Sequence, residues 1–177
     1  MSYDDCYIQS VIRDVADWPS PGVTFRDIAP LFQDPKALHI VIDALCQRYI
    51  DSDITHIAAL DARGFLLGGA LAYKLNLPLI LVRKKDKLPG PTVRQEYQLE
   101  YGSATVEIQQ DACKADDRVL IVDDLIATGG SILAAATLVR QLGAQVAEAA
   151  AIIDLPDLQG SARLQDADIP VHTLIAY

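Results

Sequence analysis

The sequence predicts an α/β fold in which a mostly parallel, twisted sheet is flanked by helices. Five short apolar runs recur along the 177 residues, and helical stretches separate several of them. Strands that are apolar on both faces and joined by helices are typical of right-handed crossovers around a buried parallel sheet. The runs are HIAAL over 56–60, PLILV over 78–82, VLIV over 119–122, AAAII over 149–153 and VHTLIA over 171–176.

The size and charge of the chain limit what it can be. At roughly 150 residues per domain, 177 residues predict a single domain over 1–177. Apolar types make up 51% and charged types 22%, which excludes wholesale disorder. With 15 Lys and Arg against 24 Asp and Glu, the net charge is −9. Such a surface repels phosphodiester backbones and anionic lipid, so we expect neither a nucleic-acid nor a membrane partner.

Several features favour a cytoplasmic location. The longest uncharged run, Leu125–Val139, is too short for a membrane span and is broken by two glycines. The N-terminal stretch MSYDDCYIQS is acidic where a secretory signal would be basic. Cys6, Cys46 and Cys113 are odd in number and far apart. We therefore expect reduced thiols rather than disulfides or a zinc site.

Two helices are expected before the first apolar run. Apolar residues at 8, 11, 12 and 15 form the stripe of a short amphipathic helix, which the prolines and glycine over 19–22 end. The following stretch VTFRDIAPLF, over 23–32, is expected to be an ordered loop. Pro35 suits the first turn of a second helix, whose buried face comes from apolar residues at 38, 41, 42 and 45.

Helical and polar stretches lie between the later runs. We expect a helix over 64–75, a long polar excursion over 83–117 and a helix over 131–142 that ends at Gly143. In open α/β sheets, ligands bind beyond the carboxyl ends of the strands. The residues that follow each apolar run are therefore the first candidates for a functional site.

The stretch VLIVDDLIATGGS, over 119–131, places polar groups at such a strand end. Asp123 and Asp124 follow the apolar run, and consecutive strand residues point to opposite faces, so the two carboxylates are expected to differ in role. A turn of little side-chain bulk then leads into a helix; its residues are Ala127, Thr128, Gly129, Gly130 and Ser131. Backbone N–H groups and hydroxyls there can cradle a phosphate, while the acids accept bonds from sugar hydroxyls or hold Mg²⁺. The stretch therefore predicts a ribose-phosphate site.

Two nucleotide-binding motifs and a plain turn are the alternatives for this stretch. An apolar strand that ends in two aspartates could be a Walker B element, but no G-x-x-x-x-G-K-[ST] motif occurs in the chain. A dinucleotide site would require G-x-G-x-x-G, which is also missing. The glycines could form only a turn with a helix cap, but the acidic pair and both hydroxyls argue against that alternative.

The same stretch resembles the ribose-phosphate signature of the type I phosphoribosyltransferases, which use phosphoribosyl pyrophosphate (PRPP). The resemblance implies the fold of that family, with a small hood from the N-terminal segment 1–30 and a long flexible lid loop over 84–104. It also implies that Asp123 and Asp124 meet the ribose hydroxyls, directly or through Mg²⁺ carried by PRPP. The turn over 127–131 would bind the 5′-phosphate.

A pyrophosphate leaving group needs cations, which an acidic chain must supply locally. Residues 83–94 hold a third of all the basic residues, with Asp86 as their only acid. Such a cluster is typical of a focused anion site, although a solvated lysine-rich loop is the alternative. We assign pyrophosphate binding to Arg83, Lys84 and Lys87, and no role to Arg94.

A second candidate for the pyrophosphate is Asp61-Ala62-Arg63, where another apolar run enters a helix. Its N–H groups and Arg63 would face the same sheet edge as the acidic pair. The alternative is an Arg63 that only pairs with Asp61. In the resembled family this loop carries a non-proline cis peptide, which would here be the bond between Asp61 and Ala62.

Further segments are similar to the members of the family that use adenine as the acceptor. They are PGVTFRDI over 21–28, DARGF over 61–65, KLPGPT over 87–92 and YQLEYG over 97–102. The resemblance implies purine salvage, in which adenine and PRPP give AMP and pyrophosphate. Backbone groups of Thr24 would bind the base, with Arg26 beside the ring and Leu125 and Leu155 on its two faces. Phe25 belongs to the same segment, with burial in the core as its alternative.

Glu100 lies near the end of the polar excursion, which is rich in Pro and Gly as active-site lids are. A carboxyl group that closes over a purine can exchange a proton with N7, so Glu100 is the candidate catalytic residue; an exposed loop glutamate is the alternative. Tyr97 and Tyr101 would cover the ribose and pyrophosphate and exclude water.

Two other activities remain open at this point. One is a phosphoribosyltransferase for a 6-oxopurine, namely hypoxanthine, guanine or xanthine. The other is a PRPP-sensing regulator without turnover, although the chain has neither a spare domain nor a basic face for nucleic acid. The family resemblance also implies a homodimer in which Arg83 reaches into the partner's site.

Overall fold

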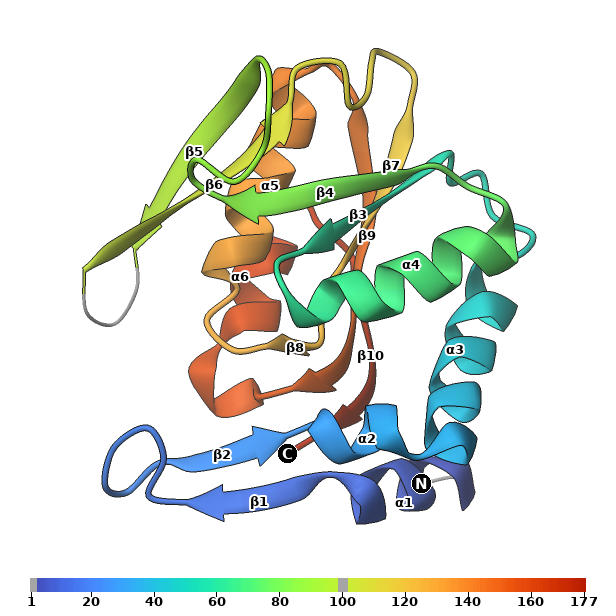
Figure 1. Ribbon diagram of the computed structural model, residues 1–177, viewed down its shortest axis with the longest axis vertical. Coiled ribbons are helices and arrows are strands. Elements are labelled where there is room, and N and C mark those ends of the chain that lie inside the picture. The colour runs from blue at the N-terminus through green and yellow to red at the C-terminus, as the bar shows by residue number, and fades with distance from the viewer. Residues whose placement is uncertain (1–2, 99–101) are drawn as a thin grey trace. The chain divides into compact units, whose positions relative to one another are not determined.

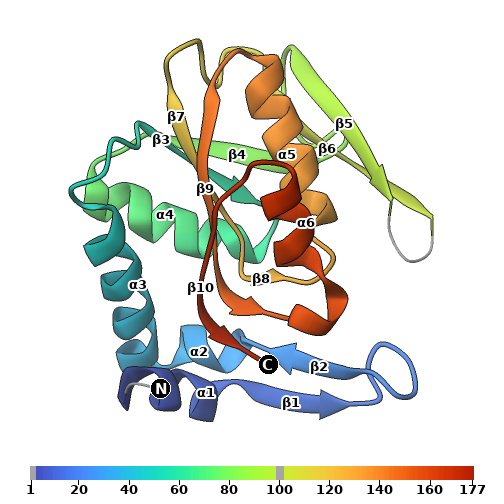
Figure 2. The same cartoon turned by 180° about the vertical axis from the view of Figure 1, so that it is seen from behind.

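The computed structural model describes residues 3–98 and 102–177. The chain divides into two compact units, Met1–Gln47 and Arg48–Tyr177, each with its own arrangement of helices and strands. Figures 1 and 2 label their helices and strands. The expected single domain, with a hood over 1–30 and a lid over 84–104, stays a prediction.

The N-terminal unit contains helices and one antiparallel hairpin. Its elements are α1 (Tyr3–Val11), β1 (Arg13–Ala16), β2 (Thr24–Asp27), α2 (Ala29–Gln33) and α3 (Pro35–Tyr49), of which the last two residues belong to the second unit. In the hairpin, Arg26 forms an ion pair with Asp14 across the two strands. The rings of Trp18 and Phe25 meet edge to face at 4.3 Å between their centroids.

Two predictions for this unit are wrong. The expected helix over 8–15 ends at Val11, and Val15 lies in β1 opposite Phe25. A β-branched valine suits a strand, and the pairing with β2 supplies hydrogen bonds that outweigh the weak helical periodicity. The stretch 23–32 is also no loop, because it contains β2 and the first four residues of α2. The start of α3 at Pro35 is confirmed.

The second unit is an α/β sheet, as predicted. Its strands are β3 (His56–Leu60), β4 (Leu79–Lys84), β5 (Thr92–Gln98), β6 (Ser103–Gln109), β7 (Arg118–Val122), β8 (Leu125–Ile126), β9 (Gln145–Asp154) and β10 (Val171–Ala176). Its helices are α4 (Arg63–Leu75), α5 (Gly130–Gln141), the short 3-10 helix η1 (Pro156–Leu158) and α6 (Gly160–Asp166). Neither α6 nor β8 was predicted from the sequence.

The strand order explains where the helices lie. The sheet runs β10-β9-β7-β3-β4-β6-β5, parallel from β10 to β4 and antiparallel in the β4-β6-β5 part. From β3 the chain moves to β4 on one side, and from β7 it moves to β9 on the other side. Right-handed crossovers in opposite directions place their helices on opposite faces. Accordingly α4 covers one face and α5 and α6 the other (Figures 1 and 2).

The register of the central strands creates the edge at which a ligand can bind. β3 and β7 pair in parallel, with Ala59 opposite Val122, and both strands are almost fully buried. Their carboxyl ends therefore lie next to each other. Asp61 follows one strand and Asp123 the other, so the two candidate loops meet at the same edge of the sheet.

The polar excursion over 83–117 is more ordered than predicted. β5 and β6 form an antiparallel hairpin within it, from Thr92 opposite Gln109 to Gln98 opposite Ser103. Polar side chains alternate along β5 because one face of the strand is exposed. The strand therefore contains no continuous apolar run, and it was not predicted. Among the described residues, no helix has the length and apolarity that a membrane crossing requires.

Candidate active site

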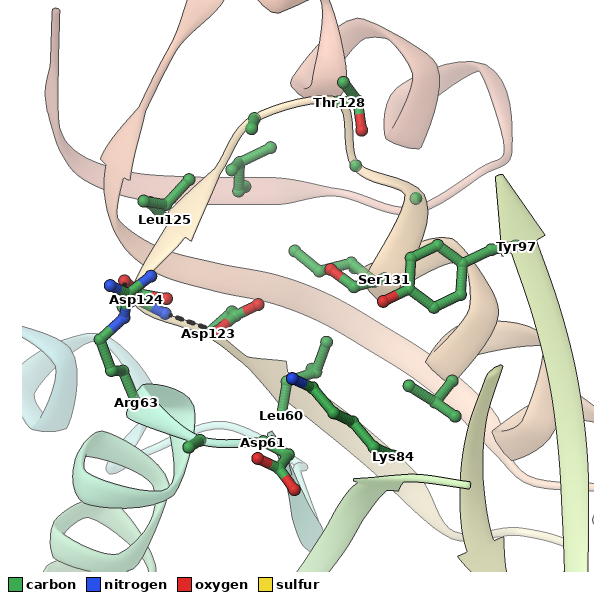
Figure 3. A pocket seen from close by; sticks show the side chains of 17 residues that line it. Leu60, Asp61, Arg63, Lys84, Tyr97, Asp123, Asp124, Leu125, Thr128 and Ser131 are labelled. Carbon is green, nitrogen blue, oxygen red and sulfur yellow. Dashed lines mark hydrogen bonds and ion pairs between the residues drawn. The ribbon is translucent and has the colours of Figure 1, made fainter. Parts of the chain in front are cut away.

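A pocket of about 250 Å³ opens where β3 and β7 end (Figure 3). It brings together most of the site residues predicted from the sequence. These are Asp61, Ala62, Arg63, Lys84, Tyr97, Asp123, Asp124, Leu125, Ala127, Thr128, Gly129, Gly130 and Ser131. The residues that follow the two strands therefore line one pocket.

The acidic pair lines this pocket. The Asp123 carboxylate accepts the backbone N–H of Asp124 at 2.9 Å. Burial, together with the adjacent Asp124 carboxylate, raises the pKa of Asp123 well above its usual range. A buried anion beside another anion is costly unless a cation or a hydroxyl donor stabilises it. The pair is therefore suited to bind sugar hydroxyls or a metal ion.

The two aspartates have different partners, as their opposite orientations predicted. The side chain of Asp124 is 6% exposed and forms an ion pair with Arg63, at 2.8 Å between Nε and Oδ2. Arg63 begins α4, so this pair ties the helix to the end of β7. Arg63 therefore does more than pair with Asp61, the predicted alternative, and Asp61 has its own cationic partner in Arg83 at 3.3 Å.

Gly64 permits this close approach. A Cβ atom there would lie 2.8 Å from the carbonyl oxygen of Val122 and 3.2 Å from Oδ1 of Asp123. Distances this short show that only glycine lets the start of α4 pack directly against the acidic pair. This role of Gly64 was not predicted from the sequence, although the residue lies within the DARGF stretch.

The turn over 127–131 forms the far wall of the pocket. Gly129 has a φ of 75° and is the N-cap of α5, a helix of 12 residues. The left-handed backbone suits glycine, and the turn directs free N–H groups of the first helical turn outward. The hydroxyl-bearing Thr128 and Ser131 line the same cavity (Figure 3). These features are typical of a phosphate site at a helix N-terminus.

Lys84 supplies a positive charge at the opposite wall. Its side chain extends from the end of β4 into the pocket (Figure 3). No carboxylate pairs with Lys84 in the part of the chain that the structure describes, whereas Arg63 and Arg83 each have an acidic partner. The lysine charge is therefore available to an anionic ligand.

Tyr97 of β5 closes the side of the pocket next to Ser131 (Figure 3). Burial and the charge of Asp123 raise the pKa of the Tyr97 phenol above its ordinary value. A Cβ atom on Gly130 would lie 3.1 Å from the Tyr97 ring. The glycine-rich turn therefore also makes room for this aromatic side chain.

The peptide bond between Asp61 and Ala62 is cis, as the family resemblance implied. Arg83 lies beside this loop without lining the pocket: its Nε donates to Asp61 and its Nη1 donates to the carbonyl oxygen of Lys87 at 3.0 Å. Lys87 is likewise outside the pocket lining. Of the basic cluster, Lys84 therefore lines the pocket, while Arg83 and Lys87 belong to a hydrogen-bond network beside it.

Glu107 organises that network and was not predicted from the sequence. The fully buried carboxylate accepts the backbone N–H groups of Lys87 and Leu88, each at 2.9 Å. It also forms an ion pair with Arg94 at 3.0 Å. Burial alone would raise the pKa of Glu107, but these N–H groups and Arg94 lower it. A glutamate within the run over 103–109 gives no sequence signal, because its partners are backbone groups.

The remaining predicted residues lie elsewhere. Leu155 follows β9 outside the pocket lining, and its N–H donates to the carbonyl oxygen of Ile126 at 3.0 Å. Thr24, Phe25 and Arg26 form β2 in the N-terminal unit. Glu100 and Tyr101 lie outside the described residues.

The residues present fit a magnesium ion whose other ligands come from substrate phosphates and water. No group of three or more His, Cys, Asp or Glu side chains suited to a metal occurs within residues 3–98 and 102–177. Mg²⁺ commonly binds through one or two carboxylates together with substrate phosphates and water. The adjacent carboxylates of Asp123 and Asp124, which both line the pocket, match that pattern.

Comparisons with known proteins agree with this geometry. Residues 31–170 match the family model of the phosphoribosyl transferase domain. The chain is 60% identical over 177 residues to an adenine phosphoribosyltransferase of Marinomonas sp. (strain MWYL1), covering 100% of the chain and 98% of the relative. The crystal structure of adenine phosphoribosyltransferase from Rhodothermus marinus superposes with a TM-score of 0.91 at 43% identity, over 98% of each chain.

A third relative was solved with ligands. Adenine phosphoribosyltransferase from Trypanosoma brucei, in complex with AMP, pyrophosphate and ribose-5-phosphate, superposes with a TM-score of 0.91 at 30% identity. The superposition covers 99% of this chain and 80% of that one.

Proposed function

The chain belongs to the adenine phosphoribosyltransferases of the phosphoribosyl transferase family, and from this premise we propose how its residues carry out the reaction. It is an enzyme of purine salvage, a pentosyltransferase with adenine phosphoribosyltransferase activity. In this reaction N9 of adenine forms a bond to C1′ of PRPP, while the bond from C1′ to the pyrophosphate oxygen breaks. The bonding electrons leave with pyrophosphate, and AMP remains.

We assign the ribose-phosphate half of the donor to β7 and the turn that follows it. The 5′-phosphate binds the N–H groups and hydroxyls of residues 127–131, at the start of α5. The ribose hydroxyls donate to Asp123 and Asp124, and these hydrogen bonds stabilise the Asp123 anion, whose pKa is raised by burial and by the adjacent Asp124 carboxylate. The observation that carries the proposal is this single pocket, with carboxylates at one end and a small-residue turn at the other.

The pyrophosphate half of PRPP lies at the cationic side of the pocket. Lys84, which has no acidic partner in the described part of the chain, binds it directly, together with the backbone of Asp61–Arg63. Arg83 and Lys87 contribute charge from the surrounding network. Asp123 and Asp124 would hold Mg²⁺ together with PRPP, and the ion would neutralise part of the departing negative charge. Catalysis then depends on positioning and electrostatic stabilisation of the leaving group, without a covalent nucleophile.

We assign recognition of the base to Thr24, Phe25 and Arg26 of β2, with Leu125 and Leu155. A backbone N–H and C=O of Thr24 bond N1 and the 6-amino group of adenine, and a 6-oxopurine presents the opposite pattern. Glu100 takes the proton from N7 as N9 attacks, which makes N9 the better nucleophile. Tyr97 and Tyr101 exclude water from C1′.

The substrate assay that tests this function compares four bases. With PRPP and Mg²⁺, we expect adenine to give equal amounts of AMP and pyrophosphate, and kcat/KM for hypoxanthine, guanine and xanthine to be at least about 100-fold lower. Glu100→Ala is expected to slow turnover of adenine by about 100-fold, because it removes the proton acceptor. Faster use of a 6-oxopurine would favour the first alternative. Binding of PRPP without release of pyrophosphate would favour a regulator.

We also propose that the chain forms a homodimer through α4 and β4. Leu66 and Tyr73, seven residues apart on α4, are 55% and 89% exposed. Leu79 and Leu81 share one face of β4 and are 37% and 40% exposed. Large apolar side chains gathered on neighbouring elements are typical of protein interfaces. A second copy of the chain is the partner that the family resemblance implies, and that Arg83 then reaches the partner's site stays a prediction.

Light scattering after size exclusion tests the dimer. We expect a mass of twice 19.2 kDa for the native chain. Tyr73→Glu should weaken association by about tenfold or more, because it buries a charge in the interface. Ile50→Glu is the matched control, since Ile50 is 68% exposed and lies outside α4 and β4. A native chain that elutes as a monomer at assay concentration would contradict the proposal.

A further inference from the structure

Arg163 of α6 makes a hydrogen bond to the turn that lines the pocket. Its Nη1 donates to the carbonyl oxygen of Thr128 at 2.8 Å, across 35 positions of sequence. Figure 2 shows α6 beside the loop that joins β8 to α5. Arg163 is exposed and does not line the main pocket, so nothing in the proposed reaction uses it.

The hydrogen bond fixes the orientation of one peptide unit of the turn. In a planar trans peptide, the C=O and the following N–H point in opposite directions. Because the guanidinium holds the carbonyl oxygen of Thr128, the N–H of Gly129 leaves the same plane on the side away from Arg163. Gly129 lines the pocket, and its φ of 75° gives this peptide conformational freedom that a neighbour must restrict.

The same bond also affects the electrostatics of the turn. A cation without a competing carboxylate polarises the peptide unit, and hydrogen bonds in a chain strengthen one another. No ion pair to Arg163 occurs in the part of the chain that the structure describes. The N–H of Gly129 therefore becomes a stronger donor toward an anion on its other side.

We propose that Arg163 is a positioning residue for the 5′-phosphate: it holds the Thr128–Gly129 peptide with its N–H toward the ligand and adds positive charge behind it. The proposal rests on the phosphate role that the proposed function gives to residues 127–131. It extends that role to a helix that contributes no side chain to the pocket. Arg163 acts through the turn and does not touch the ligand.

Calorimetric titration with two partial ligands tests the proposal. Ribose 5-phosphate occupies the phosphate end of the pocket, and pyrophosphate occupies the other end. For Arg163→Ala we expect the dissociation constant of ribose 5-phosphate to rise about five- to tenfold, as the loss of one charge-assisted hydrogen bond predicts. The dissociation constant of pyrophosphate should change less than about twofold. In steady-state assays the KM for PRPP should rise while kcat changes little.

Two further variants separate positioning from stability. Arg163→Lys keeps a cationic donor and should recover part of the affinity for ribose 5-phosphate. Arg140→Ala is the matched control, because the Arg140 guanidinium donates to the backbone carbonyl of Ala167 at 3.0 Å and is also exposed. It should leave the affinity for both ligands unchanged. All three variants should unfold at urea concentrations close to that of the native chain.

Three results would overturn the proposal. If the native chain binds ribose 5-phosphate and Arg163→Ala binds it with the same affinity, the positioning role alone is refuted. Equal weakening of ribose 5-phosphate and pyrophosphate would show a general loss of structure instead. Failure of the native chain to bind ribose 5-phosphate would refute the phosphate site of the proposed function, and the role of Arg163 with it.

Discussion

Replacing Gly160 by alanine is expected to lower kcat/KM for PRPP by about 10²- to 10³-fold without unfolding the protein. A Cβ atom at Gly160 would lie 2.1 Å from the carbonyl oxygen of Ala127 and 2.9 Å from the amide nitrogen of Gly129. Both neighbours are backbone atoms, so no side-chain rotation can relieve the clash. The turn itself must move, and its N–H groups would leave the positions that a phosphate requires.

The position of Gly160 explains why the effect should be concentrated in the site. It is buried at the start of α6 and packs directly against the turn over 127–131. Steady-state kinetics at varied PRPP measure the loss, and a urea titration measures stability. We expect the rise in KM for PRPP to exceed the rise in KM for adenine, because the proposed function assigns the turn to the 5′-phosphate of PRPP.

Gly69→Ala is the matched control for this substitution. Gly69 lies in α4, its backbone is not in the left-handed region, and no atom lies within 4 Å of the position its Cβ would take. Alanine there should leave the kinetics unchanged and stabilise the helix slightly. If Gly160→Ala had the kinetics of the native chain, the turn would accommodate the added Cβ without loss of function. The packing of α6 against the turn would then not be needed for activity.

The acidic pair and the turn after it could be predicted from the sequence because their signals are local. Four apolar residues before Asp123 predict a buried strand, and the carboxyl end of a parallel strand is where ligands bind. The small residues over 127–131 predict a turn into a helix by their lack of bulk. In such stretches, residues that are neighbours in the sequence also line the same pocket.

The supporting residues could not be predicted because their partners are remote backbone atoms. Gly160 packs against the carbonyl of Ala127, and Arg163 donates a hydrogen bond to the carbonyl of Thr128. Glu107 accepts hydrogen bonds from N–H groups of an earlier loop. Because nearly every residue type has the same backbone groups, the residue at the partner position gives no sign of the contact. The β1–β2 hairpin was missed for a related reason, since the pairing of Val15 with Phe25 outweighs the helical spacing of Val15.

Glu107→Ala is expected to lower the free energy of unfolding by about 3 kcal/mol, because two backbone N–H groups and Arg94 lose their buried acceptor. The carboxylate is fully buried at the root of the β5–β6 hairpin and receives the N–H groups of Lys87 and Leu88. Urea denaturation measures the change. Glu107→Gln, which keeps one carbonyl oxygen as an acceptor, should lose less.

The same substitutions should weaken pyrophosphate binding. Glu107 holds the segment that contains Lys87, the carbonyl of Lys87 accepts Arg83, and Arg83 pairs with Asp61. The network therefore joins the root of the hairpin to the loop with the cis peptide. Glu148→Ala is the control, because Glu148 also binds an arginine, Arg48, at 2.6 Å but lies outside the pocket. It should lower stability and leave the affinity for pyrophosphate unchanged.

The pH dependence of stability separates the charge of Glu107 from its shape. Its backbone donors and Arg94 lower the pKa of Glu107 below the ordinary value of 4.5. A carboxyl group whose pKa is lower in the folded state stabilises the fold above its unfolded pKa and loses that contribution as the pH falls through its folded pKa. The difference in unfolding free energy between the native chain and Glu107→Gln should therefore be largest near neutral pH and shrink below pH 4.5. A difference that stays constant across that range would mean that packing, rather than the charge of the carboxylate, holds the root of the hairpin.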